Sequence, residues 1–157
     1  MLKPAEDAPD FTLPCDGGGD VTLSALRPAP VVLFFYPRDD TSGCTTEALA
    51  FTALAPQFGV AGAKVYGISK DSIARHDRFR EKHGLGVPLL SDADGDVCER
   101  YGVWKQKSLY GRKFMGIERA TVLIGGDGRV ARVWPRVKVP GHAEAVLEAV
   151  REVGRAQ

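Results

Sequence analysis

The chain has 157 residues, of which 44% are apolar and 26% charged, and its formal net charge is +1. This length predicts one domain over residues 1–157, and the apolar share is enough to close one hydrophobic core. The composition excludes an intrinsically disordered chain, and no apolar run is long enough to cross a membrane. The N-terminal residues lack the basic segment and apolar run of a signal peptide, so we expect a cytoplasmic protein.

The cysteines and histidines predict no metal site. The three cysteines, at positions 15, 44 and 98, are too few and too irregularly spaced for a disulfide framework or a zinc site. His76, His83 and His142 have no metal-ligand spacing and are expected at the surface. Residues 105–138 hold nine basic residues against two acidic ones. They carry no recognition motif, so we expect a solvated surface and no nucleic-acid site.

Strand and helix patterns alternate along the chain. Alternating apolar residues at 11–13 and 21–23 flank a Gly-rich turn and predict an N-terminal β-hairpin. The apolar run 31–36 predicts a strand buried on both faces. Further strands are expected at 64–69, 87–90, 121–124 and 130–134, and helices at about 44–59, 71–83, 94–101 and 141–150. This order indicates an α/β fold with a mixed β-sheet flanked by helices.

Cys44 lies where the buried strand has ended and an amphipathic helix begins. Unpaired N–H groups and the positive end of the helix dipole meet there, and both stabilise a thiolate. A small buried core cysteine is the alternative, but the charged, Gly-containing loop before Cys44 favours a reactive thiol. The Thr41 hydroxyl, the N–H groups of Gly43 and Cys44, and a nearby arginine are candidates for stabilising negative charge on a bound electrophile.

The segment around Cys44 carries a resemblance to a known family. Residues 35–47 read FYPRDDTSGCTTE and contain the motif Pro-x-x-x-Thr-x-x-Cys. Here the chain closely resembles the peroxiredoxins, in their bacterioferritin-comigratory or Q-type branch. The similarity continues through GISKDS at 67–72, LLSD at 89–92, YGVW at 101–104 and GIER at 116–119. It implies a thioredoxin-like fold and reduction of hydrogen peroxide or organic hydroperoxides without a cofactor.

The resemblance also implies the roles of individual residues. Cys44 would attack the peroxide O–O bond and become a sulfenic acid. Thr41 would hydrogen-bond the bound peroxide, and Pro37 would shield the site from water. Arg119 would hold the thiolate and polarise the O–O bond. Only the resemblance identifies Arg119, because it is far from Cys44 in the sequence.

The chain departs from the family pattern at one position. Many members of this branch carry a resolving cysteine five residues after the peroxidatic one, where this chain has Leu49. Cys98 is expected to be an inert thiol in a short helix and Cys15 to lie nearer solvent. We therefore expect a one-cysteine cycle in which thioredoxin or a small thiol reduces Cys44 directly. A Cys44–Cys98 disulfide is the main alternative, with Cys15 less favoured as a resolving residue.

Two other functions are compatible with a reactive cysteine. One is a redox-sensing protein without useful turnover, and the other is a thioredoxin-like thiol–disulfide oxidoreductase. Matches at Thr41 and Arg119 favour the peroxidase, because a sensor needs only the cysteine. A Cys-x-x-Cys pair is missing, which disfavours the oxidoreductase. Because the sequence shows no conspicuous interface segment, we expect a monomer.

Overall fold

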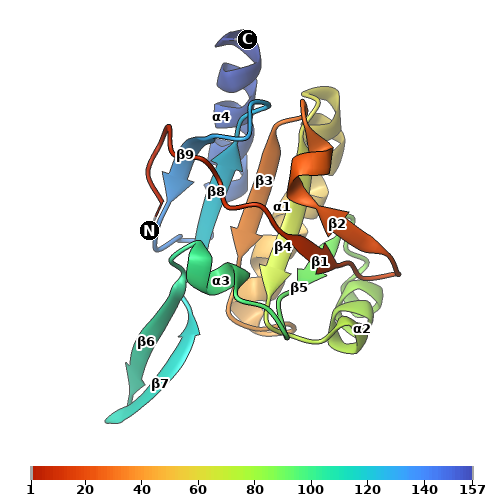
Figure 1. The fold of residues 1–157 in the computed structure, drawn as a ribbon. Coiled ribbons are helices and arrows are strands. Elements are labelled where there is room, and N and C mark those ends of the chain that lie inside the picture. The colour runs from red at the N-terminus through yellow and green to blue at the C-terminus, as the bar shows by residue number, and fades with distance from the viewer. Residues whose placement is uncertain (1, 157) are drawn as a thin grey trace.

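A computed structural model describes residues 2–156, and a five-stranded mixed sheet forms its centre (Figure 1). The strand order is β5-β4-β3-β8-β9. The parallel strands are β3 (Val31–Phe35), β4 (Lys64–Ser69) and β5 (Leu89–Ser91). β8 (Ala120–Ile124) is antiparallel to β3, and β9 (Val130–Trp134) is antiparallel to β8. The expected mixed sheet is therefore confirmed.

Different elements cover the two faces of this sheet. The helices α1 (Ser42–Val60), α2 (Ile73–His83) and α4 (His142–Ala156) cover one face. The other face is covered by the antiparallel pair β1 (Thr12–Pro14) and β2 (Asp20–Thr22), the 3₁₀ helix η1 (Leu23–Leu26) and the short helix α3 (Val97–Arg100). The arrangement is thioredoxin-like, and the expected N-terminal hairpin is present.

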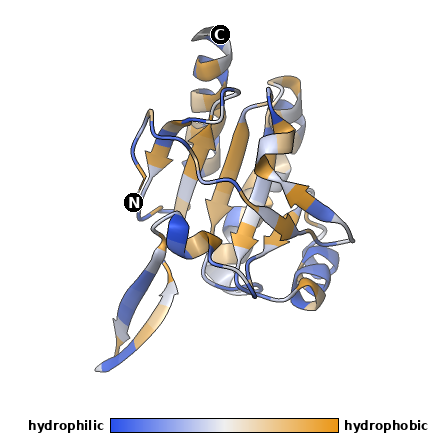
Figure 2. Ribbon diagram, in the orientation of Figure 1, coloured by the Kyte–Doolittle hydropathy of each residue, from blue (hydrophilic) through white to orange (hydrophobic). Residues whose placement is uncertain are grey.

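The central strand β3 separates two apolar cores. Val32 and Phe34 belong to the core under the helices, and Phe34 stacks on Phe51 of α1 with ring centroids 4.5 Å apart. Leu33 and Phe35 belong to the core on the opposite face. All of β3 is buried, which explains why its sequence is a continuous apolar run (Figure 2). The rigid end of this strand positions the loop that leads into α1.

One hairpin was not predicted from the sequence. β6 (Trp104–Leu109) and β7 (Arg112–Ile117) form a separate antiparallel pair that projects away from the main sheet (Figure 1). Most of its side chains are exposed, so its sequence shows no alternation of apolar and polar residues. The turn is made by Tyr110 and Gly111, which both have positive φ angles, as a type I′ hairpin turn requires.

The helix α3 (Val97–Arg100) is shorter than the helix expected at residues 94–101. It begins at Val97 because the buried carboxylate of Asp92 accepts hydrogen bonds from the N–H groups of Val97 and Cys98. Within residues 2–156, no helix is both long enough and apolar enough to span a bilayer.

Candidate active site

Cys44 lies in the first turn of α1, at the carboxyl end of β3. Thr41 is the N-cap residue, but its hydroxyl donates to the carbonyl of Arg38 at 3.2 Å and makes no side-chain cap. The N–H groups at the start of α1 are therefore not occupied by a capping side chain. Such a helix start is suited to hold negative charge.

Arg119 contacts Cys44 although the two residues are distant in the sequence. Its Nη2 donates to Cys44 Sγ at 3.3 Å, although 75 residues separate the two in the chain. The pairing of β3 with β8 explains this contact, because Ala120 lies opposite Phe35 in the register. Arg119 precedes Ala120 directly, so it lies at the end of the sheet from which the Cys44 loop emerges.

Glu47, which the sequence interpretation missed, completes the cluster. Its Oε1 accepts a hydrogen bond from Arg119 Nη1 at 2.7 Å. The carboxylate is buried, and its Oε2 has no hydrogen-bond partner among the described residues. Burial raises the pKa of Glu47 from 4.5 to about 7, against the opposing charge of Arg119. Helical spacing could have identified Glu47, because residues i and i+3 share one helix face and Glu47 lies three residues after Cys44.

Gly43 and Pro37 contribute in different ways to the surroundings of Cys44. A Cβ atom at Gly43 would lie 3.2 Å from Arg119 Nη2, so glycine allows the guanidinium to come close to the helix start. Pro37 and Thr41 are exposed at the rim. The structure thus brings Cys44, Gly43 and Arg119 into contact, and leaves Pro37 and Thr41 beside them on the loop.

The loop before Cys44 is anchored to α2 by a buried network. Tyr36 Oη donates to Asp39 Oδ1 at 2.6 Å, and His76 Nδ1 lies 2.6 Å from Asp39 Oδ2. His76 Nε2 donates to the carbonyl of Leu90 at 2.9 Å. Although burial opposes it, Asp39 raises the pKa of His76 above its ordinary value. His76 was expected at the surface, and this was wrong, because it is fully buried to hold the loop.

The same network explains a cluster of potential metal ligands. Ligand atoms of Asp39, Asp71 and His76 lie within 4.8 Å of one another. Asp71 Oδ2, however, already accepts from the Ser69 hydroxyl at 2.6 Å and from the Asp39 N–H at 2.8 Å. The hydrogen bonds within the protein therefore account for this geometry.

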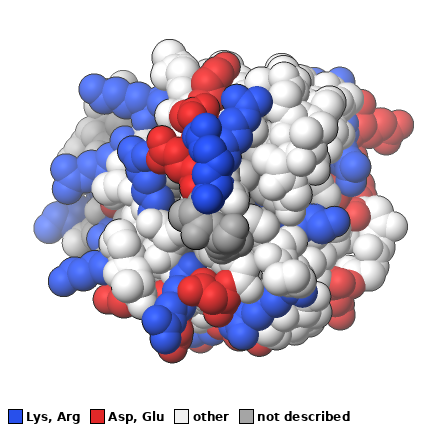
Figure 3. Space-filling model, turned by 90° about the horizontal axis from the view of Figure 1, so that it is seen from above, with Lys and Arg blue, Asp and Glu red and all other residues white. Residues whose placement is uncertain are grey.

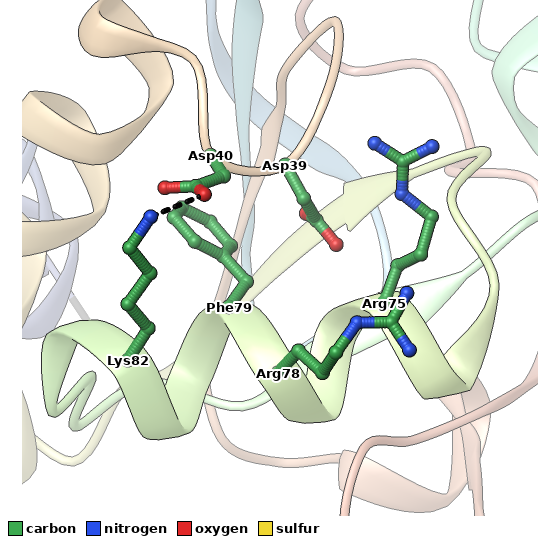
Figure 4. Close-up of a pocket in the computed structure, with 6 residues that line it drawn as sticks. All are labelled: Asp39, Asp40, Arg75, Arg78, Phe79 and Lys82. Carbon is green, nitrogen blue, oxygen red and sulfur yellow. Dashed lines mark hydrogen bonds and ion pairs between the residues drawn. The ribbon is translucent and has the colours of Figure 1, made fainter.

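A polar cavity of about 310 Å³ lies between this loop and α2. Asp39 and Asp40 extend from the loop, and Lys82 pairs with Asp40 at 2.8 Å (Figure 4). Arg75, Arg78 and Phe79 line the α2 side. This cavity and Arg119 lie on opposite sides of the loop. The strand β8, which follows Arg119, lies on one side of β3, and the helix α2 lies on the other (Figure 1).

A more apolar cavity of about 460 Å³ lies between the start of α1 and the segment that leads into α4. It is lined by Ser42, Gly43, Thr46, Ala50, Val139, Pro140, Gly141 and Glu144. Most of these side chains are small or apolar, so the cavity is suited to hold an apolar group beside Gly43, the residue before Cys44.

His142 lies buried near this cavity, at the start of α4. It was expected at the surface, and this expectation was also wrong. Its Nε2 lies 2.8 Å from the Thr121 hydroxyl, and its ring packs edge-on against Phe51 and Trp134. Burial and the charge of Arg119 lower the pKa of His142 to about 4, which leaves its imidazole neutral at pH 7.

The other two cysteines lie on the far face of the sheet. Cys44 belongs to the core under the helices, whereas Cys98 belongs to the opposite core and Cys15 packs against that second core. All three are free thiols. Burial raises the pKa of Cys98 well above its usual range and that of Cys15 to about 11. The sheet therefore separates both of them from Cys44.

Comparison with known proteins gives a consistent result. The model of the AhpC/TSA family matches residues 4–133. Peroxiredoxin Bcp of Xanthomonas campestris is 47% identical over 142 residues, which cover 90% of this chain and 89% of that protein. Peroxiredoxin Bcp of Bacillus subtilis is 40% identical over 152 residues, which cover 97% of each chain.

Solved structures agree with the sequence relatives. A mutant of Xylella fastidiosa PrxQ superimposes with a TM-score of 0.92 at 39% identity, and covers 100% of this chain and 99% of its own. The bacterioferritin comigratory protein of Xanthomonas campestris, which has alkyl peroxide reduction activity, superimposes with a TM-score of 0.87 at 45% identity. That match covers 92% of each chain.

Proposed function

The chain belongs to the AhpC/TSA family as a peroxiredoxin of the Bcp or Q type, and on this premise we propose that Cys44 is the nucleophile of a thiol peroxidase. The observation that carries the proposal is the hydrogen bond from Arg119 to Cys44 Sγ at 3.3 Å, at an uncapped helix start. A core cysteine has no need of a partly buried guanidinium beside its sulfur. A nucleophile that must carry negative charge does.

The reaction starts when the Cys44 thiolate attacks one oxygen of the peroxide. An S–O bond forms, the O–O bond breaks, and the second oxygen leaves as an alkoxide or hydroxide that takes up a proton. Cys44 becomes a sulfenic acid, and the peroxide becomes an alcohol or water. The sulfur is oxidised by two electrons, and the peroxide is reduced by two.

The neighbouring residues act on the charge that moves in this step. Arg119 stabilises the thiolate and then the negative charge that develops on the leaving oxygen. The Thr41 hydroxyl and the N–H groups of Gly43 and Cys44 bind the peroxide oxygens, and Pro37 limits access of water from the rim. Positioning by several donors is needed, because ionisation of the thiol alone gives only about a thirtyfold gain in thiolate over a free cysteine.

The substrates that fit this site are hydrogen peroxide and organic hydroperoxides. The apolar cavity of about 460 Å³ next to Gly43 supports an organic group on the peroxide. The alkyl peroxide reduction activity of the Xanthomonas campestris relative is consistent with this assignment.

Regeneration follows a one-cysteine cycle in which an external thiol reduces the Cys44 sulfenic acid. This part of the proposal is supported by the separation of Cys44 from Cys15 and Cys98 by the central sheet. The reductant is thioredoxin or a small thiol. We further propose a cytoplasmic monomer, and three free cysteines suit a reducing compartment.

Non-reducing mass spectrometry after one equivalent of peroxide tests this cycle. We expect one added oxygen on the Cys44 peptide and no peptide pair that has lost two hydrogens. The Cys98→Ser and Cys15→Ser variants should give the same product. A disulfide between the Cys44 and Cys98 peptides in the wild type, absent from Cys98→Ser, would refute the one-cysteine cycle.

A further inference from the structure

The β6–β7 hairpin has the composition of an interaction surface. Residues 104–117 contain four basic residues and no acidic one. The hairpin also exposes large apolar side chains, with Leu109 58% exposed, Tyr110 97%, Phe114 46% and Met115 50%. Within residues 2–156, its two strands pair only with each other (Figure 1), and its side chains range from hydrophilic to hydrophobic (Figure 2). On the face seen in Figure 3, by contrast, acidic and basic side chains are interspersed.

The strand register divides the hairpin into two faces. Residues directly opposite one another in an antiparallel pair point to the same side of the ribbon. One side, which we call the Lys107 face, carries Lys105, Lys107, Leu109, Arg112, Phe114 and Gly116. The other side, the Met115 face, carries Trp104, Gln106, Ser108, Lys113, Met115 and Ile117. Three of the four cations therefore lie on the Lys107 face.

The Lys107 face is continuous with the site around Cys44. Lys107 is half-buried, whereas Lys105 and Arg112 are exposed. The aliphatic part of the Lys107 side chain lies over Gly116, where a Cβ atom would be 3.3 Å from Lys107 Cδ. Burial and the charge of Arg119 lower the pKa of Lys107, and the charge of Cys44 partly offsets them. β7 ends at Ile117, two residues before Arg119, whose guanidinium donates to Cys44 Sγ at 3.3 Å, so the base of the hairpin adjoins the Cys44 site.

The Met115 face leads elsewhere. Trp104, at its base, lies under the ammonium of Lys70, which is 5.0 Å from the ring centroid. Lys70 in turn pairs with Asp92, which directly follows β5, and with Glu99 of α3. This face therefore adjoins α3, which makes it an internal control for the Lys107 face.

The proposed function requires a reductant that reaches Cys44 directly, and the following inference rests on it. We propose that the Lys107 face is the docking surface for an acidic dithiol protein of the thioredoxin class, which reduces the Cys44 sulfenic acid. Its positive charge and exposed apolar side chains complement a partner surface with acidic residues around an apolar centre.

The two thiols of the partner regenerate Cys44 in two steps. One thiolate of the partner attacks the Cys44 sulfur, the S–O bond breaks, and the oxygen leaves as water after it takes up protons. The second thiol of the partner then attacks the mixed disulfide. Cys44 leaves as a thiolate, and the partner leaves as an oxidised disulfide, so two electrons pass from the partner to Cys44.

Two neighbouring residues on β7 provide a matched test. Arg112→Glu reverses a charge on the Lys107 face, and Lys113→Glu makes the same reversal on the Met115 face. The probe is an acidic thioredoxin with its reductase and NADPH, and the readout is kcat/KM for thioredoxin. We expect Arg112→Glu to lower kcat/KM about tenfold and to weaken its dependence on salt, with less than about a twofold change for Lys113→Glu.

Two controls separate docking from peroxide chemistry. The rate of Cys44 oxidation in a single turnover, and turnover supported by dithiothreitol, should be the same in the wild type and both variants. The docking proposal would be overturned if the two substitutions changed kcat/KM equally or not at all. The proposed function would still stand in that case, provided that peroxide oxidises Cys44. A wild type that peroxide does not oxidise would overturn both.

Sedimentation distinguishes a second copy of the chain from a reductant. If Arg112→Glu breaks a wild-type dimer and leaves kcat/KM for thioredoxin unchanged, the Lys107 face binds another copy and the docking proposal is wrong. A monomer in all three proteins, together with the tenfold loss, supports it.

Discussion

Arg119 donates to Cys44 Sγ at 3.3 Å and is held from its other side by Glu47 at 2.7 Å. The guanidinium therefore bridges a thiol and a carboxylate that lie one helical turn apart on α1. Because both partners are largely buried, the bridge acts in surroundings that screen charge poorly. The stabilisation of negative charge at Cys44 therefore depends on where Arg119 is held.

Replacing Arg119 should slow the attack on peroxide without removing the nucleophile. We expect Arg119→Met to lower the second-order rate constant for Cys44 oxidation by about a hundredfold to a thousandfold, the usual loss for one oxyanion donor. Arg119→Lys should retain part of the rate, since it keeps the charge but loses the second donor. Stopped-flow measurement of Cys44 oxidation tests this, and a rate within threefold of wild type in Arg119→Met would contradict it.

Gly43 offers a more subtle test of the same geometry. A methyl group there would crowd Arg119 Nη2, so Gly43→Ala should slow Cys44 oxidation. Gly59→Ala, in the same helix but with open space around its Cβ, should leave the rate unchanged. Alanine is the better helix former by about 1 kcal/mol, so neither variant should unfold. Equal oxidation rates in the two variants would show that the approach of Arg119 does not depend on Gly43.

Glu47 should make stability depend on pH in an unusual direction. Its pKa in the folded state is about 7, above the ordinary 4.5, so the folded protein binds the proton more tightly than the unfolded chain. Its contribution to the free energy of unfolding is complete below about pH 4.5 and falls by up to about 3 kcal/mol as the pH rises through 7. Urea unfolding at pH 5 and pH 8 should show this fall in the wild type and a smaller one in Glu47→Gln.

The same comparison has a clear opposite outcome. If the difference in unfolding free energy between pH 5 and pH 8 is the same in the wild type and in Glu47→Gln, Glu47 does not titrate in this range. The buried ion pair with Arg119 would then be fully charged at both pH values.

Asp39 should anchor the loop that carries Pro37 and Thr41. Asp39→Ala leaves the Tyr36 hydroxyl and the His76 ring without their buried partner, and we expect a loss of about 3–5 kcal/mol in unfolding free energy. The control is Asp40→Asn. Asp40 is exposed, and asparagine tolerates its positive φ of 61°, so the loss in unfolding free energy should be much smaller than that of Asp39→Ala. Similar losses in the two variants would exclude a special role for the Asp39 network.

Sequence patterns sufficed for the parts of the fold that are buried on a regular period. The apolar run of β3 and the helical spacing of Ala48 and Phe51 both follow from burial, which leaves a direct trace in the sequence. The β6–β7 hairpin could not be predicted this way, because exposed strands need no apolar alternation. His76 and His142 were misplaced for a related reason, since their hydrogen-bond partners Asp39 and Thr121 are distant in sequence.

Some residues of the site could be identified from local sequence, and others depend on tertiary contacts. Cys44 was identifiable from its place at a strand-to-helix junction. Arg119 became identifiable only through a family resemblance, because the β3–β8 pairing that brings it to Cys44 is a tertiary contact. Glu47 was within reach of helix spacing, but an acidic residue in a helix is ordinarily solvated, and its burial depends on Arg119.

The identity of the nucleophile is tested most directly by single-turnover peroxide consumption in four proteins: wild type, Cys44→Ser, Cys98→Ser and Cys15→Ser. We predict that wild type, Cys98→Ser and Cys15→Ser each consume one equivalent rapidly, with the sulfenic acid trapped on the Cys44 peptide. Cys44→Ser should consume none above the uncatalysed rate. Rapid consumption by Cys44→Ser would contradict the account, because a different residue would then reduce the peroxide.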